Sequence, residues 1–293
     1  MEIIVGETAG FCAGVRNAVT KTEQILQNDK KICCLGELVH NRQVIENLEE
    51  KGLKTIENIT EVNKGEKVVI RAHGVPKNVY EYAKKAKIEI VDLTCPKVLM
   101  IHKQAENLSK DGYFVILIAQ KEHPEAIGTI SFCGNNSAII ENIDEIPKVI
   151  KKINNSKKKN IAVVCQTTFS IKKFEEMCIA LKDKLDINVN FQIYNTICNA
   201  TSLRQRETTK IANNVEAMII IGGKNSSNTR KLYEISKDIC LNTFLIQTKE
   251  ELEVEKLKSF NKIGVMAGAS TPKESIESVI EKLKEISSNK ILV

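Results

Sequence analysis

The sequence contains no tryptophan, and aromatic residues make up only 4% of its 293 residues. Single-stranded nucleic acids are usually held by stacking their bases on aromatic side chains, so a nucleic-acid-binding role is not expected. The formal net charge of +6 is modest, and the densest basic run, KKINNSKKKN at residues 151–160, has no aromatic residue. We predict that this run is a solvated loop. The mild positive charge favours a small anionic substrate.

No apolar run approaches the ~18 residues that indicate a membrane span. The first ten residues, MEIIVGETAG, lack the basic flank and the cleavage site of a signal peptide. We therefore expect a cytoplasmic protein in which thiols stay reduced. No GxGxxG motif follows a predicted strand, so an intrinsic nicotinamide or flavin site is not expected.

The nine cysteines form no CxxC pair, and their odd number and scattered positions are typical neither of a disulfide framework nor of a zinc ribbon. Six of them lie in apolar runs or on predicted helix faces and are expected to be small core residues. These six are Cys33, Cys34, Cys133, Cys165, Cys178 and Cys240.

Short runs rich in Ile and Val alternate with amphipathic helical patterns along the whole chain. We predict strands at residues 3–5, 31–35, 67–71, 88–92, 113–119, 137–141, 161–165, 190–193, 217–221, 243–246 and 263–267. Nearly continuous β-branched runs are typical of parallel strands covered on both faces. The repeated strand–helix alternation therefore predicts an α/β fold with mostly parallel sheets.

Polar or reactive residues follow these strands with a repeated spacing. In chain order they form three triplets: Cys12, His40 and His73; Cys95, His123 and Thr167; Cys198, Ser226 and Ser270. The first two members of each triplet are 28 positions apart, and the later steps are 33, 44 and 44 positions. A long period with matched chemistry indicates an internal repeat, so we predict three similar α/β modules.

Ligands of parallel α/β sheets gather at the carboxyl ends of the strands, where the three triplets are expected to lie. Three convergent thiolates would bind a soft metal. A structural zinc site usually has a fourth ligand, whereas a four-iron cluster with three cysteines leaves one iron for substrate. The stretch KNSSN, which includes Ser226, Ser227 and Asn228, offers hydroxyl and amide donors at a helix start, as phosphate binding requires.

Two other functions are compatible with parts of this pattern. His123-Pro-Glu125 resembles the start of a zinc deaminase motif, which suggests a zinc-dependent hydrolase or deaminase, but the PCxxC that should follow is missing. A non-catalytic phosphate-ligand-binding protein with core cysteines is the other alternative. His102 lies outside the repeat, and we interpret it as an ordinary surface or satisfied helix residue.

The motifs taken together resemble the 4-hydroxy-3-methylbut-2-enyl diphosphate reductase family of the non-mevalonate isoprenoid pathway. They are GFCAGV, VHN, AHGV, DLTCP, HPE, QTT, ICNAT, GKNSSN and AGAST. The resemblance implies three α/β modules in a pseudo-threefold arrangement around a central [4Fe–4S] cluster. The expected modules are residues 13–95, residues 96–194, and residues 1–12 with 195–293, so that the first strand joins the third module.

The resemblance also assigns roles to individual residues. Cys12, Cys95 and Cys198 are the expected cluster ligands, with one iron left for substrate. Glu125 is the expected proton donor, and it has no carboxylate counterpart in the other two triplets. The residues expected to contact the substrate diphosphate, or in the case of Thr167 to lie beside the acid, are His40, His73, His123, Thr167, Ser226, Ser227, Asn228 and Ser270.

The implied reaction is reductive dehydroxylation of the allylic diphosphate to isopentenyl and dimethylallyl diphosphate. The implied partner is a transient electron donor such as ferredoxin or flavodoxin.

Overall fold

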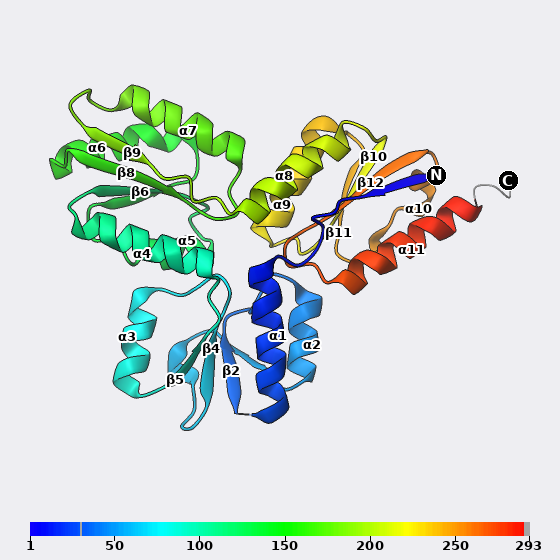
Figure 1. The fold of residues 1–293 in the computed structure, drawn as a ribbon, viewed down its shortest axis with the longest axis horizontal. Helices are drawn as coiled ribbons and strands as arrows, with labels where there is room; N and C mark the ends of the chain where they lie inside the picture. Colours follow the sequence, from blue (N-terminus) through cyan, green and yellow to red (C-terminus); the bar gives the residue numbers. More distant parts are fainter. Residues whose placement is uncertain (30, 290–293) are drawn as a thin grey trace. The chain divides into compact units, whose positions relative to one another are not determined.

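The computed structural model describes residues 1–29 and 31–289, which contain three four-stranded sheets (Figure 1). The first sheet has the order β3 (Lys54–Ile56), β2 (Ile32–Leu35), β4 (Lys67–Ile70) and β5 (Glu89–Asp92). The second has β7 (Ser137–Ile140), β6 (Phe114–Ile118), β8 (Asn160–Cys165) and β9 (Asn190–Ile193). The third has β11 (Thr243–Ile246), β10 (Ala217–Ile221), β12 (Lys262–Ala267) and β1 (Glu2–Val5). All neighbouring strands are parallel, so the predicted fold class is confirmed.

The three sheets share one strand order, with the first and third strands of each module at the centre. In the third sheet the strand beyond β12 comes from the start of the chain, because β1 pairs with β12 in the register Ile3 to Ile263. The family resemblance implies that the first strand joins the third module. The module boundaries and the pseudo-threefold arrangement stay predictions.

The chain forms two compact units. Unit 1 consists of Met1–Arg16, Val39–Asn47 and the chain from Asn199 onward, and it contains the third sheet. Unit 2 consists of Asn17–Leu38 and Leu48–Cys198, and it contains the first and second sheets.

The helices cover both faces of the second and third sheets. In β6 the side chains of Phe114, Ile116 and Ile118 pack with α6 (Ile146–Ser156) and α7 (Ile171–Lys184), while Val115 and Leu117 face α4 (Pro96–Lys110) and α5 (Pro124–Ile130). In the third sheet α11 (Lys273–Asn289) covers one face, and α8 (Asn199–Ala212) and α9 (Ser227–Ile239) cover the other. Burial on two faces explains the continuous apolar runs.

The first sheet packs against α3 (Lys77–Ala86) on one face, and Figure 1 shows α1 (Ala13–Asn28) beside it. The other helical segments are α2 (Arg42–Glu50), α10 (Val254–Leu257), η1 (Ile59–Glu61), η2 (Ile143–Glu145) and η3 (Lys249–Glu251). Within residues 1–29 and 31–289, no helix has the length and apolar character needed to cross a membrane.

Two local predictions are wrong. Strand β3 was not predicted, because it is a three-residue edge strand with only Ile56 buried and shows too little periodicity. The first six residues of the basic run belong to helix α6 rather than to a loop, since Val149 and Ile153 lie one turn apart and are both buried. The helix ends at Lys157, whose left-handed φ of 56° closes its last turn.

The central position of β6 gives a test of the core. We expect Ile116→Ala to lower the free energy of unfolding by about 2–5 kcal/mol, because the Ile116 side chain is fully buried and leaves a cavity. The matched control is Ile187→Ala at a site that is 96% exposed, for which a change within about 0.5 kcal/mol is expected. Chemical denaturation measures both, and equal losses would contradict the placement of β6 in the core.

Candidate functional site

Each of the three cysteines of the repeat lies directly before a helix and is held there by its own backbone. Cys12, Cys95 and Cys198 precede α1, α4 and α8, and each donates its N–H to a carbonyl just beyond the third strand of a module, at 3.0 Å. The accepting carbonyls belong to Ala269, Ala72 and Thr167, respectively. The repeat predicted from the spacing is therefore present in the backbone hydrogen bonds.

The cysteines of the repeat differ in exposure from most of the others. Cys12, Cys95 and Cys198 are half-buried, whereas all but one of the six predicted core cysteines are buried. The exception is Cys133, which is half-buried, and none of the nine cysteines forms a disulfide. Only the first set is both accessible to a ligand and placed at helix starts.

The Sγ of Cys12 accepts a hydrogen bond from the N–H of Val15, in the first turn of α1, at 3.4 Å. In the core, burial raises the pKa of Cys33 to about 11 and that of Cys34 to about 12. The core thiols are therefore poor metal ligands by comparison.

The loop before Cys12 is tied to helix α8 within unit 1. Arg204, only 4% exposed, donates from Nη2 to the carbonyl of Gly10 at 2.6 Å. Glu207, on the same helix, accepts the N–H of Thr8 at 3.0 Å. The sequence reasoning missed both charged residues, although their positions three apart on one helix face could have indicated a common partner.

His40 and Ser270 meet in unit 1, where the Ser270 hydroxyl donates to the His40 carbonyl at 3.1 Å. Gly223 lies against the same carbonyl, and a Cβ at that position would be 2.6 Å from the oxygen. A side chain at residue 223 would therefore displace the His40 segment.

The start of helix α9 lies directly after Gly223 in the chain. Ser226 caps this helix, its hydroxyl accepting the N–H of Thr229 at 3.4 Å. Ser227 and Asn228 are 2% and 3% exposed, and among the described residues neither polar atom of the Asn228 side chain has a hydrogen-bond partner. A buried amide with unmet hydrogen bonds at a helix start is what an anion-binding site requires.

His123 caps helix α5 in unit 2, and its Nδ1 accepts the N–H of Glu125 at 3.1 Å. Since Nδ1 is the acceptor, the proton of the neutral ring lies on Nε2. The ring meets that of His73 edge to face, with the centroids 5.5 Å apart. Unit 2 thus brings these two predicted residues together with a donor N–H on His123.

Glu125 is 2% exposed and makes two short hydrogen bonds with Thr167. The Thr167 hydroxyl donates to Oε2 at 2.5 Å, and the Thr167 N–H donates to Oε1 at 2.6 Å. Burial raises the pKa of Glu125 to about 7, and the two hydrogen bonds from Thr167 act in the opposite direction. The carboxyl is consequently able to hold and release a proton near neutral pH.

The backbone register refines the position of Thr167 in the repeat. Matching turns after the third strands are closed by Gly74, Phe169 and Thr271, which donate to the carbonyls of Arg71, Gln166 and Gly268. This places Thr168 in line with His73 and Ser270, one residue after the position that the spacing indicates.

The family profile described as LytB protein matches residues 3–284. The chain belongs to the LytB family. It is 40% identical to the 4-hydroxy-3-methylbut-2-enyl diphosphate reductase of Clostridioides difficile over 288 residues, which are 98% of this chain and 100% of the relative. It is 39% identical to the Aquifex aeolicus reductase of the same name, covering 98% of this chain and 97% of the relative.

Two solved structures agree with this family assignment. The E-1-hydroxy-2-methyl-but-2-enyl-4-diphosphate reductase of Plasmodium falciparum has a TM-score of 0.90 at 31% identity, over 96% of this chain and 87% of that one. The (E)-4-hydroxy-3-methyl-but-2-enyl diphosphate reductase described as the terminal enzyme of the non-mevalonate pathway has a TM-score of 0.69 at 38% identity, over 97% and 100%. The resemblance found in the motifs is confirmed, and with it the prediction of a LytB reductase.

One prediction about this LytB chain is wrong. His102 is neither a surface residue nor a satisfied one, because it is 3% exposed and neither ring nitrogen has a hydrogen-bond partner among the described residues. Its ring stacks on Phe132 with the centroids 4.5 Å apart. Burial lowers the pKa of His102 to about 4, so the ring is neutral at physiological pH.

The raised pKa of Glu125 predicts a pH-dependent stability. Between pH 4.5 and 7 the folded protein keeps this proton while the unfolded chain loses it, so the free energy of unfolding falls by about 3 kcal/mol as pH rises. We expect Glu125→Gln to remove this dependence in the metal-free protein, as measured by denaturation midpoints at pH 5 and pH 8. The control is Glu122→Gln at an exposed neighbouring site, which should keep the wild-type difference. The same pH difference in wild type and Glu125→Gln would refute the shift.

Proposed function

We propose that the chain catalyses the reductive dehydroxylation of 4-hydroxy-3-methylbut-2-enyl diphosphate, giving isopentenyl and dimethylallyl diphosphate. The C–O bond of the allylic alcohol breaks, and two electrons and two protons are consumed to give the product and water. Full-length similarity to reductases of this name supports the proposal. The observation in the structure that supports it most is the buried pair of Glu125 and Thr167, in which Glu125 also donates its N–H to His123.

We propose that Cys12, Cys95 and Cys198 hold a [4Fe–4S] cluster. The donor set fits this group, because three half-buried thiols that form no disulfide occupy the same place in three repeats. Three thiolates without a fourth protein ligand are typical of a cluster that binds substrate at one iron. When bound, the cluster would pass electrons from an external carrier to the substrate one at a time and would supply a Lewis-acidic iron.

The diphosphate is held by uncharged donors rather than by a row of lysines. His123 offers Nε2–H, and Asn228 offers a buried amide at the start of α9. His40, His73, Ser226, Ser227 and Ser270 complete the proposed set. A helix start with several N–H, O–H and imidazole donors binds phosphate oxygens well, and the net positive charge of +6 attracts the substrate.

Glu125 supplies the proton that lets the hydroxyl leave as water, either directly or through the hydroxyl of Thr167. With a pKa of about 7 the acid is about half protonated at neutral pH, where general acid catalysis is most effective. The hydrogen bond between Thr167 Oγ1 and Glu125 Oε2 provides a path for proton transfer. His123 anchors the first turn of the helix that carries the acid.

Electrons come from a separate carrier, which we propose to be a small protein such as ferredoxin or flavodoxin. The sequence offers no nucleotide-binding fingerprint of its own. The cytoplasmic location expected from the N-terminal sequence stays a prediction.

The ligand assignment is tested by metal content. We expect anaerobically purified Cys95→Ser to lose most of its iron and sulfide, because one of three thiolates is missing. Cys178→Ser is the control, since that thiol is buried in the core of the second sheet. A Cys95→Ser protein with wild-type iron would overturn the assignment, and a colourless wild type with one zinc per chain would support the zinc hydrolase instead.

The proton-donor role is tested by turnover. We expect Glu125→Gln to lower kcat by about 10²–10⁴-fold while iron content and substrate affinity stay close to wild type. The amide oxygen can still accept the Thr167 N–H and the amide NH2 can donate to the Thr167 hydroxyl, but the side chain carries no acidic proton. Glu122→Gln should turn over normally. Retained turnover in Glu125→Gln would remove Glu125 from the mechanism.

A further inference from the structure

The His102 ring lies next to two glycines of the proposed acid and phosphate site. One glycine belongs to the turn after His73, and the other belongs to helix α5. One is Gly74, which follows His73 and has a left-handed φ of 75°, and a Cβ there would lie 2.8 Å from His102 Cε1. The other is Gly128 on α5, where a Cβ would lie 3.4 Å from His102 Nε2 and 3.5 Å from the backbone carbon of Val75. Both glycines leave room for the ring.

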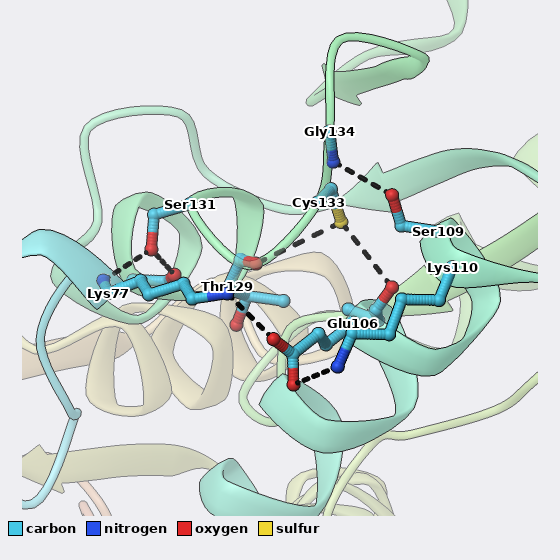
Figure 2. Close-up of polar contacts among 10 residues, drawn as sticks. Lys77, Glu106, Ser109, Lys110, Thr129, Ser131, Cys133 and Gly134 are labelled. Carbon is cyan, nitrogen blue, oxygen red and sulfur yellow. Dashed lines mark hydrogen bonds and ion pairs between the residues drawn. The ribbon is translucent and has the colours of Figure 1, made fainter.

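Polar contacts of Lys77 join the start of α3 to helix α4 and to the residue that follows α5 (Figure 2). The N–H of Lys77, at the start of α3, donates to the Ser131 hydroxyl at 2.9 Å, and that hydroxyl donates to the Gly128 carbonyl at 2.5 Å. The Lys77 ammonium pairs with Glu106 of α4 at 2.7 Å. The turn after His73, helix α4 and helix α5 are thus held around the ring, all within unit 2.

The ring acts here through its shape. Stacking on Phe132 fixes its plane, and neither nitrogen has a hydrogen-bond partner among the described residues. The low pKa keeps it uncharged at neutral pH, so it adds no charge to the site. The imidazole makes no polar contact with the described residues but lies next to the turn after His73 and next to helix α5. Its size therefore sets the distance between this turn and this helix.

We propose that His102 is a positioning residue that sets the separation between the His73 turn and helix α5, which carries His123 and Glu125. This deepens the proposed function and rests on it for its kinetic consequences. Misplacement of reacting groups by about 1 Å can lower a rate by about 10²-fold. A change in the bulk of His102 is therefore expected to alter both KM and kcat.

The kinetic test uses the cluster-loaded, full-length protein and the allylic diphosphate substrate. We expect His102→Ala to raise KM at least about tenfold and to lower kcat. His102→Leu, which restores similar bulk without polar atoms, should recover KM to within about threefold of wild type. A role confined to folding would lower the active fraction and leave KM unchanged, and that result would overturn the proposal. A His102→Leu protein as impaired as His102→Ala would also overturn it.

A second pair of variants probes the same contact from α5. Gly128→Ala alone should crowd the ring, whereas the methyl group in the His102→Ala, Gly128→Ala double variant should partly refill the vacated space. The double variant should therefore have a lower KM than His102→Ala, and additive damage would contradict the contact. Leu99→Ala, at a 41% exposed position of the same helix, is the control and should keep the wild-type KM.

An experiment that does not require enzyme activity can test this proposal separately from the proposed function. The chain has four histidines, so their ring C–H resonances can be followed by NMR in the metal-free protein. His102→Ala should shift the resonances of His73 and His123, and Leu99→Ala should not. Unmoved resonances would refute the positioning role of His102. If the wild-type protein fails to turn over the diphosphate, the proposed function is refuted, but the NMR test of the His102 proposal remains valid.

Discussion

The chemistry of this protein depends on one backbone hydrogen bond that is made three times. In each case a cysteine N–H donates to a carbonyl just beyond the third strand of a module, and a helix begins at the next residue. Parallel pairing brings the carboxyl ends of the strands to one edge, so this bond places each cysteine at the end of a sheet where ligands of α/β folds bind. Because a main-chain hydrogen bond holds each cysteine in place, its thiol is not needed for this contact and is available for the proposed metal site. Three four-stranded sheets provide three such edges.

The acid of the proposed site owes its properties to the position of its helix. Burial raises the pKa of Glu125 to about 7, and this burial exists because α5 packs on the second sheet. The same first turn uses the Glu125 N–H to fix the tautomer of His123. In the proposed mechanism one residue therefore has two roles, since its carboxyl is the proposed proton donor and its N–H orients the ring of His123. In the turn after His73, a Cβ at residue 74 would lie 2.8 Å from His102 Cε1, so a side chain there would push the turn away from helix α4.

Much of the fold and part of the site could be predicted because they follow from local patterns. Strands such as β6 and β10 are buried on both faces, so their apolar runs are continuous, whereas β3 at a sheet edge carries no such signal. The position of Thr167 was set by counting residues between modules, and connections of different length make that count unreliable by one position. His102 follows Val98 by four and precedes Ala105 by three, so helical spacing places it on the buried face of α4. Its lack of a polar partner depends on tertiary packing and has no counterpart in the sequence. The metal and substrate roles of the individual residues stay predictions.

The pairing of β1 with β12 also sets an order of events during synthesis. Cys95 and Cys198 bond to Ala72 and Thr167, which precede them in the chain and have already been made when each cysteine leaves the ribosome. Cys12 bonds instead to Ala269, and its strand β1 pairs with residues 262–265. Such distant contacts form late, because the intervening chain must be made and folded first. The first of the three cysteines to be translated is thus the last to reach its place, and the proposed three-thiolate site can be completed only after residues 262–269 have been made.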